Sequence, residues 1–421
     1  MNYKYSVFNL ETPFNDRYIL YNTYSGALSL LDTHLADGDE KEICEDLIRQ
    51  GFFVDERINE TNRLLVERNR ELYTFRIRYL HIEIAPTMTC QARCWYCFEN
   101  TATEKHTMSQ TVVQDVIKYI IERIELSQCE RLTLLFFGGE PLLAIEQIMT
   151  IGVEIKKICQ SKNIIFHSEI ISNGLLFTEK TADKIISAIN LTNIQITLDG
   201  TRETHNHSKG IPCFDSVVDN IIRNAGKIKI SIRLNVSSKN YGEICPLVDY
   251  LLCEKRLDGK VRIYLARVDD LDSCGLPGEN CLDNFSFVDF RDQFMRSAMK
   301  KYKSFDPNDL LPDIKRNYCG YEKISQILIG PEGELYRCQR TLSDKKNAIG
   351  DIYNGSFYQD EELSLLRTLP EECTAPCNLL PTCFGGCPNE RRKGRPLSYC
   401  ELKKRQIEKD ITTYVETMIS D

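Results

Sequence analysis

The chain has 421 residues, of which 42% are hydrophobic and 27% are charged, which is typical of a globular protein with two or three domains. Its net charge of −8 argues against nucleic acid as the main substrate, because binding to phosphates requires a concentrated basic surface. The N-terminus has no apolar signal core and no apolar run is as long as a membrane span, so we expect neither secretion nor a membrane partner.

The first 75 residues precede the cysteine motifs and are expected to form a unit of their own. Their pattern predicts two strands, two helices and a returning strand, at residues 5–10, 17–21, 25–31, 41–50 and 52–54. This order resembles the small winged-helix element that recognises precursor peptides in ribosomal-peptide biosynthesis. The resemblance implies that an extended leader peptide adds as a strand at an edge formed by residues 5–10 and 17–21. The alternative is a packing extension of the next domain.

A short loop with three cysteines follows the strand predicted at residues 80–85. Cys90, Cys94 and Cys97 have the spacing Cys-x3-Cys-x2-Cys, and no fourth cysteine follows within the loop. Three thiolates can bind three irons of a cubane iron–sulfur cluster, which leaves one iron open for a small molecule. A disulfide would leave one cysteine unpaired, and a zinc site usually has four ligands in a different spacing.

Predicted strands and helices alternate between residues 76 and 305, which favours a parallel sheet with right-handed crossovers. The strands are predicted at residues 80–85, 132–137, 164–171, 193–198, 229–236 and 261–266, and the helices at 110–126, 142–160, 179–188 and 213–225. Six such units predict an α/β fold, a partial (β/α)6 barrel. In barrels of this kind the chemistry lies at the carboxyl ends of the strands.

Four of these strand ends carry candidate binding residues. They are Gly138-Gly139-Glu140-Pro141, Ser172-Asn173-Gly174, Asp199-Gly200 and Asn235-Val236, after the second to the fifth strand. Two glycines let a backbone approach a ligand closely, and a carboxylate beside them can accept from an ammonium group.

The cysteine loop and these strand ends resemble the radical S-adenosylmethionine (radical SAM) superfamily. The resemblance implies a [4Fe–4S] cluster on Cys90, Cys94 and Cys97, with S-adenosylmethionine chelating the open iron. Members of the superfamily cleave S-adenosylmethionine reductively to a 5′-deoxyadenosyl radical, which abstracts a hydrogen from the substrate. The aromatic Tyr96 matches the usual surroundings of the third cysteine.

The same resemblance assigns the chemical groups of S-adenosylmethionine to different strand ends. Its amino group would lie at the Gly138–Pro141 motif, the methionyl and ribose groups near Ser172 and Asn173, and the adenine and ribose at Asn235 and Val236. After Asp199, relatives read His-Asp-x-x-Arg, whereas this chain has His205, Asn206 and Lys209. Lys209 keeps the positive charge for a carboxylate contact but loses the bidentate fork of arginine. His205 is read equally well as a polar surface residue or as a ligand.

Seven more cysteines lie between residues 306 and 421, namely Cys319, Cys338, Cys373, Cys377, Cys383, Cys387 and Cys400. Their order resembles the SPASM domain, whose cysteines bind two auxiliary [4Fe–4S] clusters, although the Cys373–Cys377 gap is one residue longer than usual. The resemblance implies that auxiliary cluster I is held by Cys319, Cys338 and Cys387, and auxiliary cluster II by Cys373, Cys377, Cys383 and Cys400. The fourth ligand of cluster I is left open between Cys274, Cys281 and the substrate. A zinc ribbon is the alternative.

SPASM proteins are mostly peptide and protein maturases, so we expect a cytoplasmic radical SAM maturase of a ribosomally made precursor peptide. It would form a thioether or a carbon–carbon crosslink and receive electrons from a flavodoxin- or ferredoxin-like donor. Oxidation of a sulfatase by an anaerobic sulfatase maturase is one alternative, although those enzymes have an aspartate where Gln339 follows Cys338 here and lack an extended N-terminal domain. A SPASM-type alcohol oxidase and a non-catalytic scaffold are the others.

Overall fold

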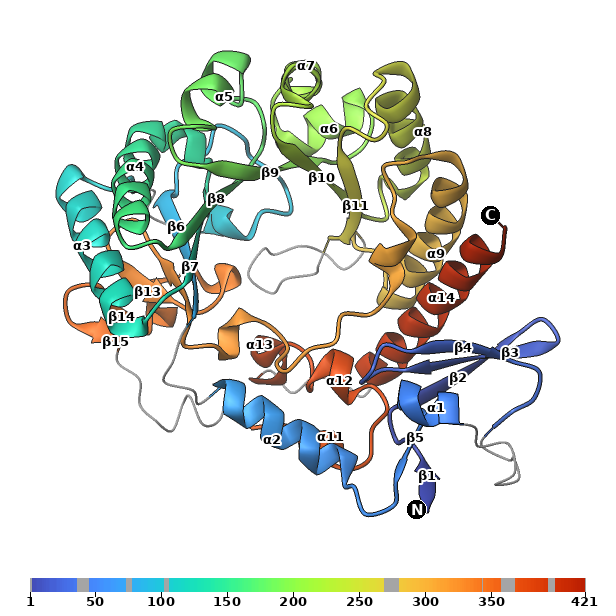
Figure 1. Cartoon of the computed structure of the whole chain (residues 1–421). Coiled ribbons are helices and arrows are strands. Elements are labelled where there is room, and N and C mark those ends of the chain that lie inside the picture. The colour runs from blue at the N-terminus through green and yellow to red at the C-terminus, as the bar shows by residue number, and fades with distance from the viewer. Residues whose placement is uncertain are drawn as a thin grey trace.

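The computed structural model describes residues 2–35, 45–72, 78–101, 106–268, 280–342, 344–356, 368–392 and 398–420. Six parallel strands form an open arc, helices cover its outer side, and C-terminal elements lie across its open side (Figure 1). Within these described residues, no helix is both long enough and apolar enough to cross a membrane.

The arc is a parallel sheet in which neighbours in sequence pair in space. Its strands are β6 (Tyr79–Thr87), β7 (Arg131–Gly138), β8 (Ile165–Ser172), β9 (Leu191–Leu198), β10 (Lys229–Val236) and β11 (Arg262–Arg267). The helices around it are α3 (Gln110–Ser127), α4 (Ile145–Ser161), α5 (Glu179–Ile185), α6 (Arg202–Lys209), α7 (Phe214–Asn224) and α8 (Ile244–Asp249). The predicted α/β fold with a parallel central sheet is therefore confirmed.

Along each strand of the arc, successive side chains point to opposite faces of the sheet. One set of side chains packs under the outer helices and forms the main hydrophobic core, as Ile82 and Ile84 do on β6. The other set faces the inside of the arc. It includes the apolar Ala85, Phe137 and Ile171 and many polar or amphipathic side chains, among them His81, Glu83, Thr133, His167, Glu169, Gln195, Thr197, Arg233 and Tyr264. The inner face is thus chemically suited to a polar substrate.

The C-terminal region extends the sheet beyond β6. Strand β12 (Gln326–Ile329) pairs in parallel with β6, and β13 (Glu334–Tyr336), β14 (Gly350–Asp351) and β15 (Gly355–Ser356) follow in antiparallel order. The helices of this region are α9 (Asn284–Lys301), α11 (Glu371–Thr374), α12 (Leu380–Cys383), α13 (Pro388–Arg392) and α14 (Ser398–Ser420). Cys338 follows β13, so β12 separates its strand from β6, the barrel strand that leads to the cysteine loop.

The N-terminal unit, defined as residues 2–72, has two small sheets. One joins β1 (Tyr3–Tyr5) to β5 (Phe53–Asp55), and the other has the order β2 (Asn9–Phe14), β3 (Arg17–Asn22) and β4 (Leu28–Leu31). Its helices are α1 (Glu45–Gln50) and α2 (Glu60–Leu72). Residues 36–44, including the start of the helix predicted at 41–50, lie outside the described part.

Three predictions for this unit are wrong. The helix predicted at residues 25–31 is the strand β4, because Leu28 and Leu30 pack toward α14 while Leu31 packs on the opposite face. The strand predicted at residues 5–10 is two strands in different sheets, β1 and β2. Residues 17–21 form no edge, because β3 is the middle strand and pairs on both sides.

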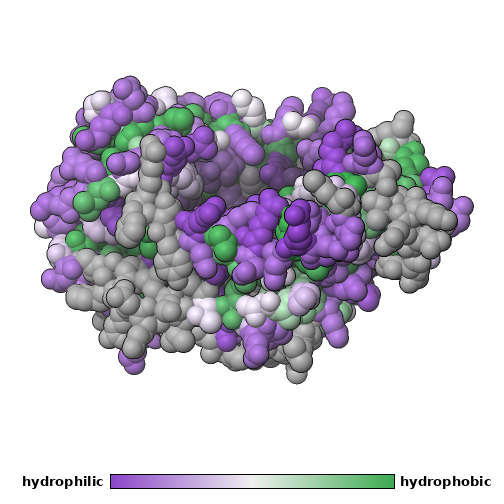
Figure 2. All heavy atoms as spheres, turned by 60° about the horizontal axis from the view of Figure 1, so that its bottom comes forward, coloured by the Kyte–Doolittle hydropathy of each residue, from purple (hydrophilic) through white to green (hydrophobic). Residues whose placement is uncertain are grey.

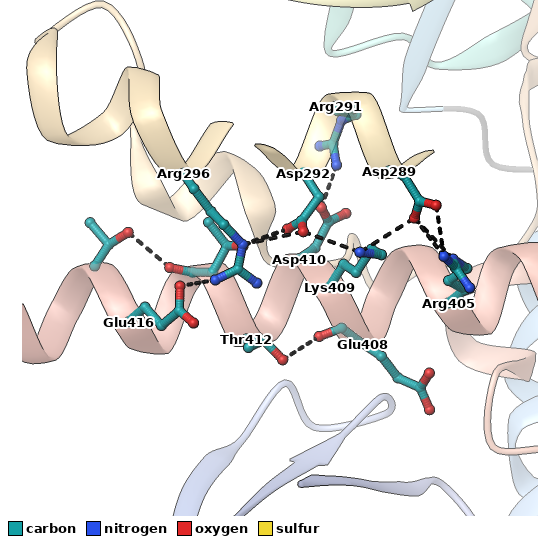
Figure 3. A network of polar contacts seen from close by, with 12 residues as sticks. Asp289, Arg291, Asp292, Arg296, Arg405, Glu408, Lys409, Asp410, Thr412 and Glu416 are labelled. Atoms are coloured by element: carbon teal, nitrogen blue, oxygen red, sulfur yellow. Dashed lines mark hydrogen bonds and ion pairs between the residues drawn. The ribbon is translucent and has the colours of Figure 1, made fainter. Parts of the chain in front are cut away.

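Helix α14 connects the N-terminal unit to the barrel. On one side its apolar residues Ile407, Ile411 and Val415 form a buried cluster with the β2–β3 sheet. On the other side it faces α9 through a network of ion pairs and hydrogen bonds (Figure 3). In this network Asp292 accepts from Arg296 at 3.1 Å and from Lys409 at 3.2 Å. The N-terminal unit is therefore held firmly against the barrel.

Candidate active site and cysteine clusters

The loop with Cys90, Cys94 and Cys97 leaves the carboxyl end of β6 and rests on helix α6. The Arg93 amide donates to the Lys209 carbonyl at 2.8 Å, and the Trp95 indole donates to the Ser208 hydroxyl at 3.3 Å. A bend closes the loop, since the Cys97 amide donates to the Cys94 carbonyl at 3.2 Å. The three thiols are only partly exposed, so the fold fixes the loop and shields it.

Gly138 and Gly139 are needed because the backbone before the cysteine loop passes directly over them. A Cβ on Gly139 would lie 2.4 Å from the Thr89 carbonyl oxygen, and Gly138 has a φ of +116°. The Gly139 amide donates to Thr87 and the Glu140 amide to Thr89, at 3.0 and 2.8 Å. These glycines therefore allow the backbone before the cysteine loop to pack closely against the end of β7.

Glu140 is fully buried and organises the next strand end. Its carboxylate accepts hydrogen bonds from the amides of Leu142 and Asn173 and from the Ser172 hydroxyl, at 3.1, 2.8 and 2.8 Å. Burial raises the pKa of Glu140 above its ordinary value, while these donors oppose the shift. The predicted contact with the amino group of S-adenosylmethionine would be a further interaction of this carboxylate, besides these three hydrogen bonds. Pro141, in the same motif, starts a short 3-10 turn and is buried.

Asn173 connects the end of β8 to the first cysteine of the loop. Its side-chain nitrogen donates to Cys90 Sγ at 3.8 Å, and its side-chain oxygen accepts from the Leu175 amide at 3.0 Å. The side-chain Nε2 of Gln91 also donates to that oxygen, at 3.4 Å. Burial raises the pKa of Cys90 to about 11. The motifs after β6, β7 and β8 thus form one continuous site.

Tyr96, Asp199 and Lys209 form a buried polar group beneath the cysteine loop. The Lys209 ammonium lies 2.9 Å from both Asp199 Oδ2 and the Tyr96 hydroxyl, which itself donates to Asp199 at 2.7 Å. Burial opposes protonation of Lys209, but Asp199 and Tyr96 hold its pKa well above the ordinary value. The charge kept at Lys209 therefore pairs with Asp199 inside the protein and fixes α6 and the loop, and its contact with a ligand carboxylate stays a prediction.

His205 is neither a surface residue nor directed toward the loop. It is fully buried, accepts from the Asp199 amide at 3.3 Å and contacts Cys213 Sγ at 3.4 Å. Burial and the nearby Lys209 charge lower the pKa of His205 to about 4. The neutral imidazole of His205 therefore helps to hold Asp199 in place by accepting a hydrogen bond from its amide.

The predicted adenine and ribose site lies at the ends of β9 and β10. The Asn240 side chain donates to the Asn235 carbonyl at 2.7 Å and also to the Asp199 carbonyl, which ties the two strand ends together. Asn235 Oδ1 accepts from Arg233 at 2.8 Å, whereas Val236 is buried in the core. Sequence reasoning missed Asn240 and Arg233, although the alternation of β10 places Arg233 on the same face as Asn235.

Glu83 is a further residue that the sequence analysis missed. It projects from β6 toward the inner face and is 7% exposed. Its two carboxylate oxygens accept from the side chains of Gln326 and Gln339, at 2.6 and 2.9 Å. His81 lies 3.5 Å away. Figure 2 shows a hollow in the surface, and hydrophilic side chains line much of it.

The seven C-terminal cysteines fall into two groups in space. Burial raises the pKa of Cys319 to about 11, with smaller contributions from Cys387 and Cys338. Burial likewise raises the pKa of Cys373 to about 11, and there Cys383, Cys377 and Cys400 contribute. These neighbours are compatible with the two predicted ligand sets, which stay a prediction. Cys281 follows Asn280, whose carbonyl accepts from Ser238 after β10, and Cys274 lies outside the described residues.

A single metal ion and a cubane cluster place different demands on these cysteines. Among the described side chains, no three His, Cys, Asp or Glu converge on one point where a single metal ion could sit. In a cubane each cysteine binds a different iron, so the thiols need to surround a volume and not a point. Cys373 and Cys383 are buried and the other five C-terminal cysteines are partly exposed, and groups of three and four thiols are compatible with that arrangement.

Comparison with known proteins identifies the central part of the chain. Residues 84–244 match the model of the Radical SAM superfamily, so this stretch, which holds the cysteine loop and the ends of β6 to β10, is a radical SAM domain. A cysteine-type anaerobic sulfatase-maturating enzyme of Clostridium perfringens is 22% identical over 325 residues, 71% of this chain and 85% of the relative. The radical SAM cyclopropyl synthase TigE of Paramaledivibacter caminithermalis is 25% identical over 183 residues, 39% of this chain and 35% of TigE.

Two groups of solved structures share the fold. Native anSMEcpe with bound AdoMet and Cp18Cys peptide has a TM-score of 0.62 at 19% identity and covers 81% of this chain and 99% of its own. Streptococcus suis SuiB bound to the precursor peptide SuiA has a TM-score of 0.56 at 17% identity and covers 94% of this chain and 98% of its own. A radical SAM domain implies a [4Fe–4S] cluster and S-adenosylmethionine.

Proposed function

We propose that this chain is a radical SAM maturase that modifies a ribosomally made precursor peptide by forming a crosslink, with a thioether as first choice over a carbon–carbon bond. One observation carries the proposal. Strand β6 ends at the cysteine loop, and its Glu83 is bonded to Gln339, the residue after Cys338. Two cysteine sites therefore flank the same polar inner face, where a peptide segment can lie between them.

The chain's own residues bind and orient the reactants. When bound, the [4Fe–4S] cluster and S-adenosylmethionine supply a 5′-deoxyadenosyl radical. Cys90, Cys94 and Cys97 would hold that cluster, with Asn173 positioning Cys90 and the buried Tyr96–Asp199–Lys209 group supporting the loop from below. Asn235 and Asn240 shape the far wall of the site. The polar inner face receives the substrate.

Auxiliary clusters would occupy the two C-terminal cysteine groups. Cys319, Cys338 and Cys387 offer three thiolates, and a substrate cysteine as the fourth ligand, in place of Cys274 or Cys281, would suit thioether formation. Cys373, Cys377, Cys383 and Cys400 offer four. Closing a crosslink removes two hydrogens from the peptide, and iron–sulfur groups near the substrate provide a place for the released electron. A flavodoxin- or ferredoxin-like donor would complete the electron supply.

The N-terminal unit would dock the leader at β4. In the β3–β4 pair, the Asn22 amide donates to the Ala27 carbonyl. Because hydrogen-bonded pairs alternate in antiparallel ladders, the backbone groups of Leu28 and Leu30 point away from β3. In the described part of the chain no strand pairs with that side of β4. An extended peptide can add there as a further strand.

Sulfatase-type oxidation is the second candidate, since the sulfatase-maturating enzymes match the chain in sequence. Two features favour the precursor peptide. The residue after Cys338 is Gln339, which has no basic side chain, and Glu83 is bonded to it instead. The SuiB fold also covers 94% of the chain, whereas the anSMEcpe fold covers 81%.

Mass spectrometry of candidate peptides tests the proposal. Reconstituted protein is incubated anaerobically with S-adenosylmethionine, dithionite and either peptides encoded beside its gene or the Cp18Cys peptide. A crosslink leaves a neighbouring-gene peptide two hydrogens lighter and free of aldehyde. Conversion of Cp18Cys to a hydrazide-reactive aldehyde, with the neighbouring-gene peptides unchanged, would establish the sulfatase-type reaction instead.

A further inference from the structure

The N-terminal unit is joined to the cysteine-rich region by buried contacts that leader docking does not require. Phe8 and Leu64 belong to one buried cluster with Cys373 and Phe384. The β2–β3 sheet forms a second cluster that contains Cys383. Two cysteines of the proposed auxiliary cluster II are therefore packed directly against the N-terminal unit.

A buried group of three charges strengthens this junction. The Glu322 carboxylate, 1% exposed, lies 3.0 Å from Arg68 Nη2 and 3.3 Å from Arg391 Nη2. Its other oxygen accepts from the Tyr318 amide at 2.8 Å. Arg68 belongs to α2, Glu322 follows Cys319, and Arg391 follows Cys387 in α13. The charges thus join three segments, two of which hold proposed cluster ligands.

The same two arginines shape the loop between Cys383 and Cys387. Phe384, Gly385 and Gly386 have φ values of +43°, +74° and +74°, a left-handed run that is strained for Phe384. Arg391 Nη1 donates to the carbonyls of Phe384 and Gly386, at 3.2 and 2.9 Å. The Arg68 guanidinium lies 5.8 Å from the centre of the Phe384 ring. The loop conformation therefore depends on both side chains.

Arg68 brings a positive charge from the N-terminal unit to this junction. Among the described residues it lies beside Glu322 and over Phe384, in the segments that carry Cys319 and Cys383. Charges in a buried site interact strongly because solvent screens them little. The reduction potential of an iron–sulfur cluster depends on nearby charge, hydrogen bonds to its sulfurs and solvent exposure. A nearby positive charge favours the reduced state.

We propose that Arg68 is a positioning residue for the auxiliary clusters, so that the N-terminal unit is a fixed part of the redox site and not a detachable docking module. This inference rests on the proposed function, which places clusters on these cysteines. It also means that a peptide docked on β4 binds to the same rigid unit that sets the cluster surroundings.

Three variants of the full-length protein test the inference, and each is reconstituted with iron and sulfide. R68M removes the buried charge, R68K keeps it, and R63M removes an exposed arginine from the same helix. Iron content is measured first, and each cluster is then titrated with reductant and followed by electron paramagnetic resonance. In R68M the equilibrium constant for reducing at least one auxiliary cluster should fall about fivefold or more, as loss of a buried charge allows. The radical SAM cluster should be unchanged, and R68K and R63M should behave like the wild type.

Full iron content and unaltered reduction of every cluster in R68M would overturn the inference. If R68M does not retain its iron, R68K decides the question. Full iron in R68K supports the role of the charge, whereas equal loss in both variants shows that α2 contributes packing alone. Zinc in place of the auxiliary iron in the wild type is a separate result, seen before any variant is made. It would refute the auxiliary clusters themselves, and this inference with them.

Discussion

The side chain of Gln339 donates a hydrogen bond of 2.9 Å to the carboxylate of Glu83. This contact joins the loop after Cys338 to the barrel strand that leads to Cys90. It places a carboxylate on the inner face beside the residue that follows Cys338. Glu83 is therefore our candidate for taking a proton from the substrate.

The variant E83Q should destabilise the protein. A glutamine amide would direct a donor toward the donors of Gln326 and Gln339, which leaves a buried polar group unsatisfied and costs about 1–3 kcal/mol. Urea unfolding measures the loss. E169Q, on the inner face of β8, serves as the control and should change stability by less than about 0.5 kcal/mol. Equal stability of both variants would contradict the buried contact.

Substitution of the buried Glu140 should reduce both the stability of the protein and its binding of S-adenosylmethionine. E140Q would lose part of a three-donor bonding pattern that fixes the turn of Ser172 and Asn173, at a cost of about 1–3 kcal/mol. Binding of S-adenosylmethionine should weaken with it, which isothermal calorimetry measures. E146Q, at an exposed position in the first turn of α4 and five residues after Pro141, is the matched control. Unaltered binding in E140Q would count against this site.

His205 predicts a specific pH dependence of stability. Its folded pKa of about 4 lies below the ordinary value of 6.5, so the unfolded chain binds the extra proton between these values. Stability should therefore be complete above pH 6.5 and fall as the pH drops toward 4, by about 3 kcal/mol. H205N should reduce this slope, whereas H207N, at an exposed position on the same helix, should leave it unchanged. Identical slopes in both variants would refute the buried neutral histidine.

Docking of a leader at β4 should protect particular amides. Leu28 and Leu30 point their backbone groups outward, whereas the groups of Ser29 and Leu31 face β3. A converted precursor peptide should therefore slow hydrogen exchange at Leu28 and Leu30. Deletion of residues 1–70 is a poor test, because it would also expose Glu322 and the clusters around Cys373. Protection confined to other strands would place the peptide elsewhere.

Much of the barrel was predictable from the sequence. The strand at residues 229–236 was predicted with its observed bounds, because apolar and polar residues alternate along it without ambiguity. The strand β4 was not, because a short run rich in leucine fits a helix as well as a strand. Its partners lie on α14, nearly 400 residues away, and no local pattern shows them.

The sequence identified many residues of the candidate site, but it did not show which contacts they make. Spacing identified Cys90, Cys94 and Cys97, and the strand ends identified Glu140 and Asp199. Their partners depend on tertiary packing, so the sequence did not show that Lys209 pairs with Asp199 and Tyr96. Glu83 escaped notice because its role appears only when Gln339 is brought against β6.

Cleavage of S-adenosylmethionine by the cysteine loop tests the central claim most directly. Protein reconstituted without oxygen is incubated with S-adenosylmethionine and dithionite, and 5′-deoxyadenosine is quantified by liquid chromatography and mass spectrometry. We predict that the wild type forms it and that the C90A/C94A/C97A variant does not. The wild type should hold about twelve irons per chain and the variant about eight, by the stoichiometry of three and two cubane clusters. Undiminished 5′-deoxyadenosine from the triple variant would contradict the account.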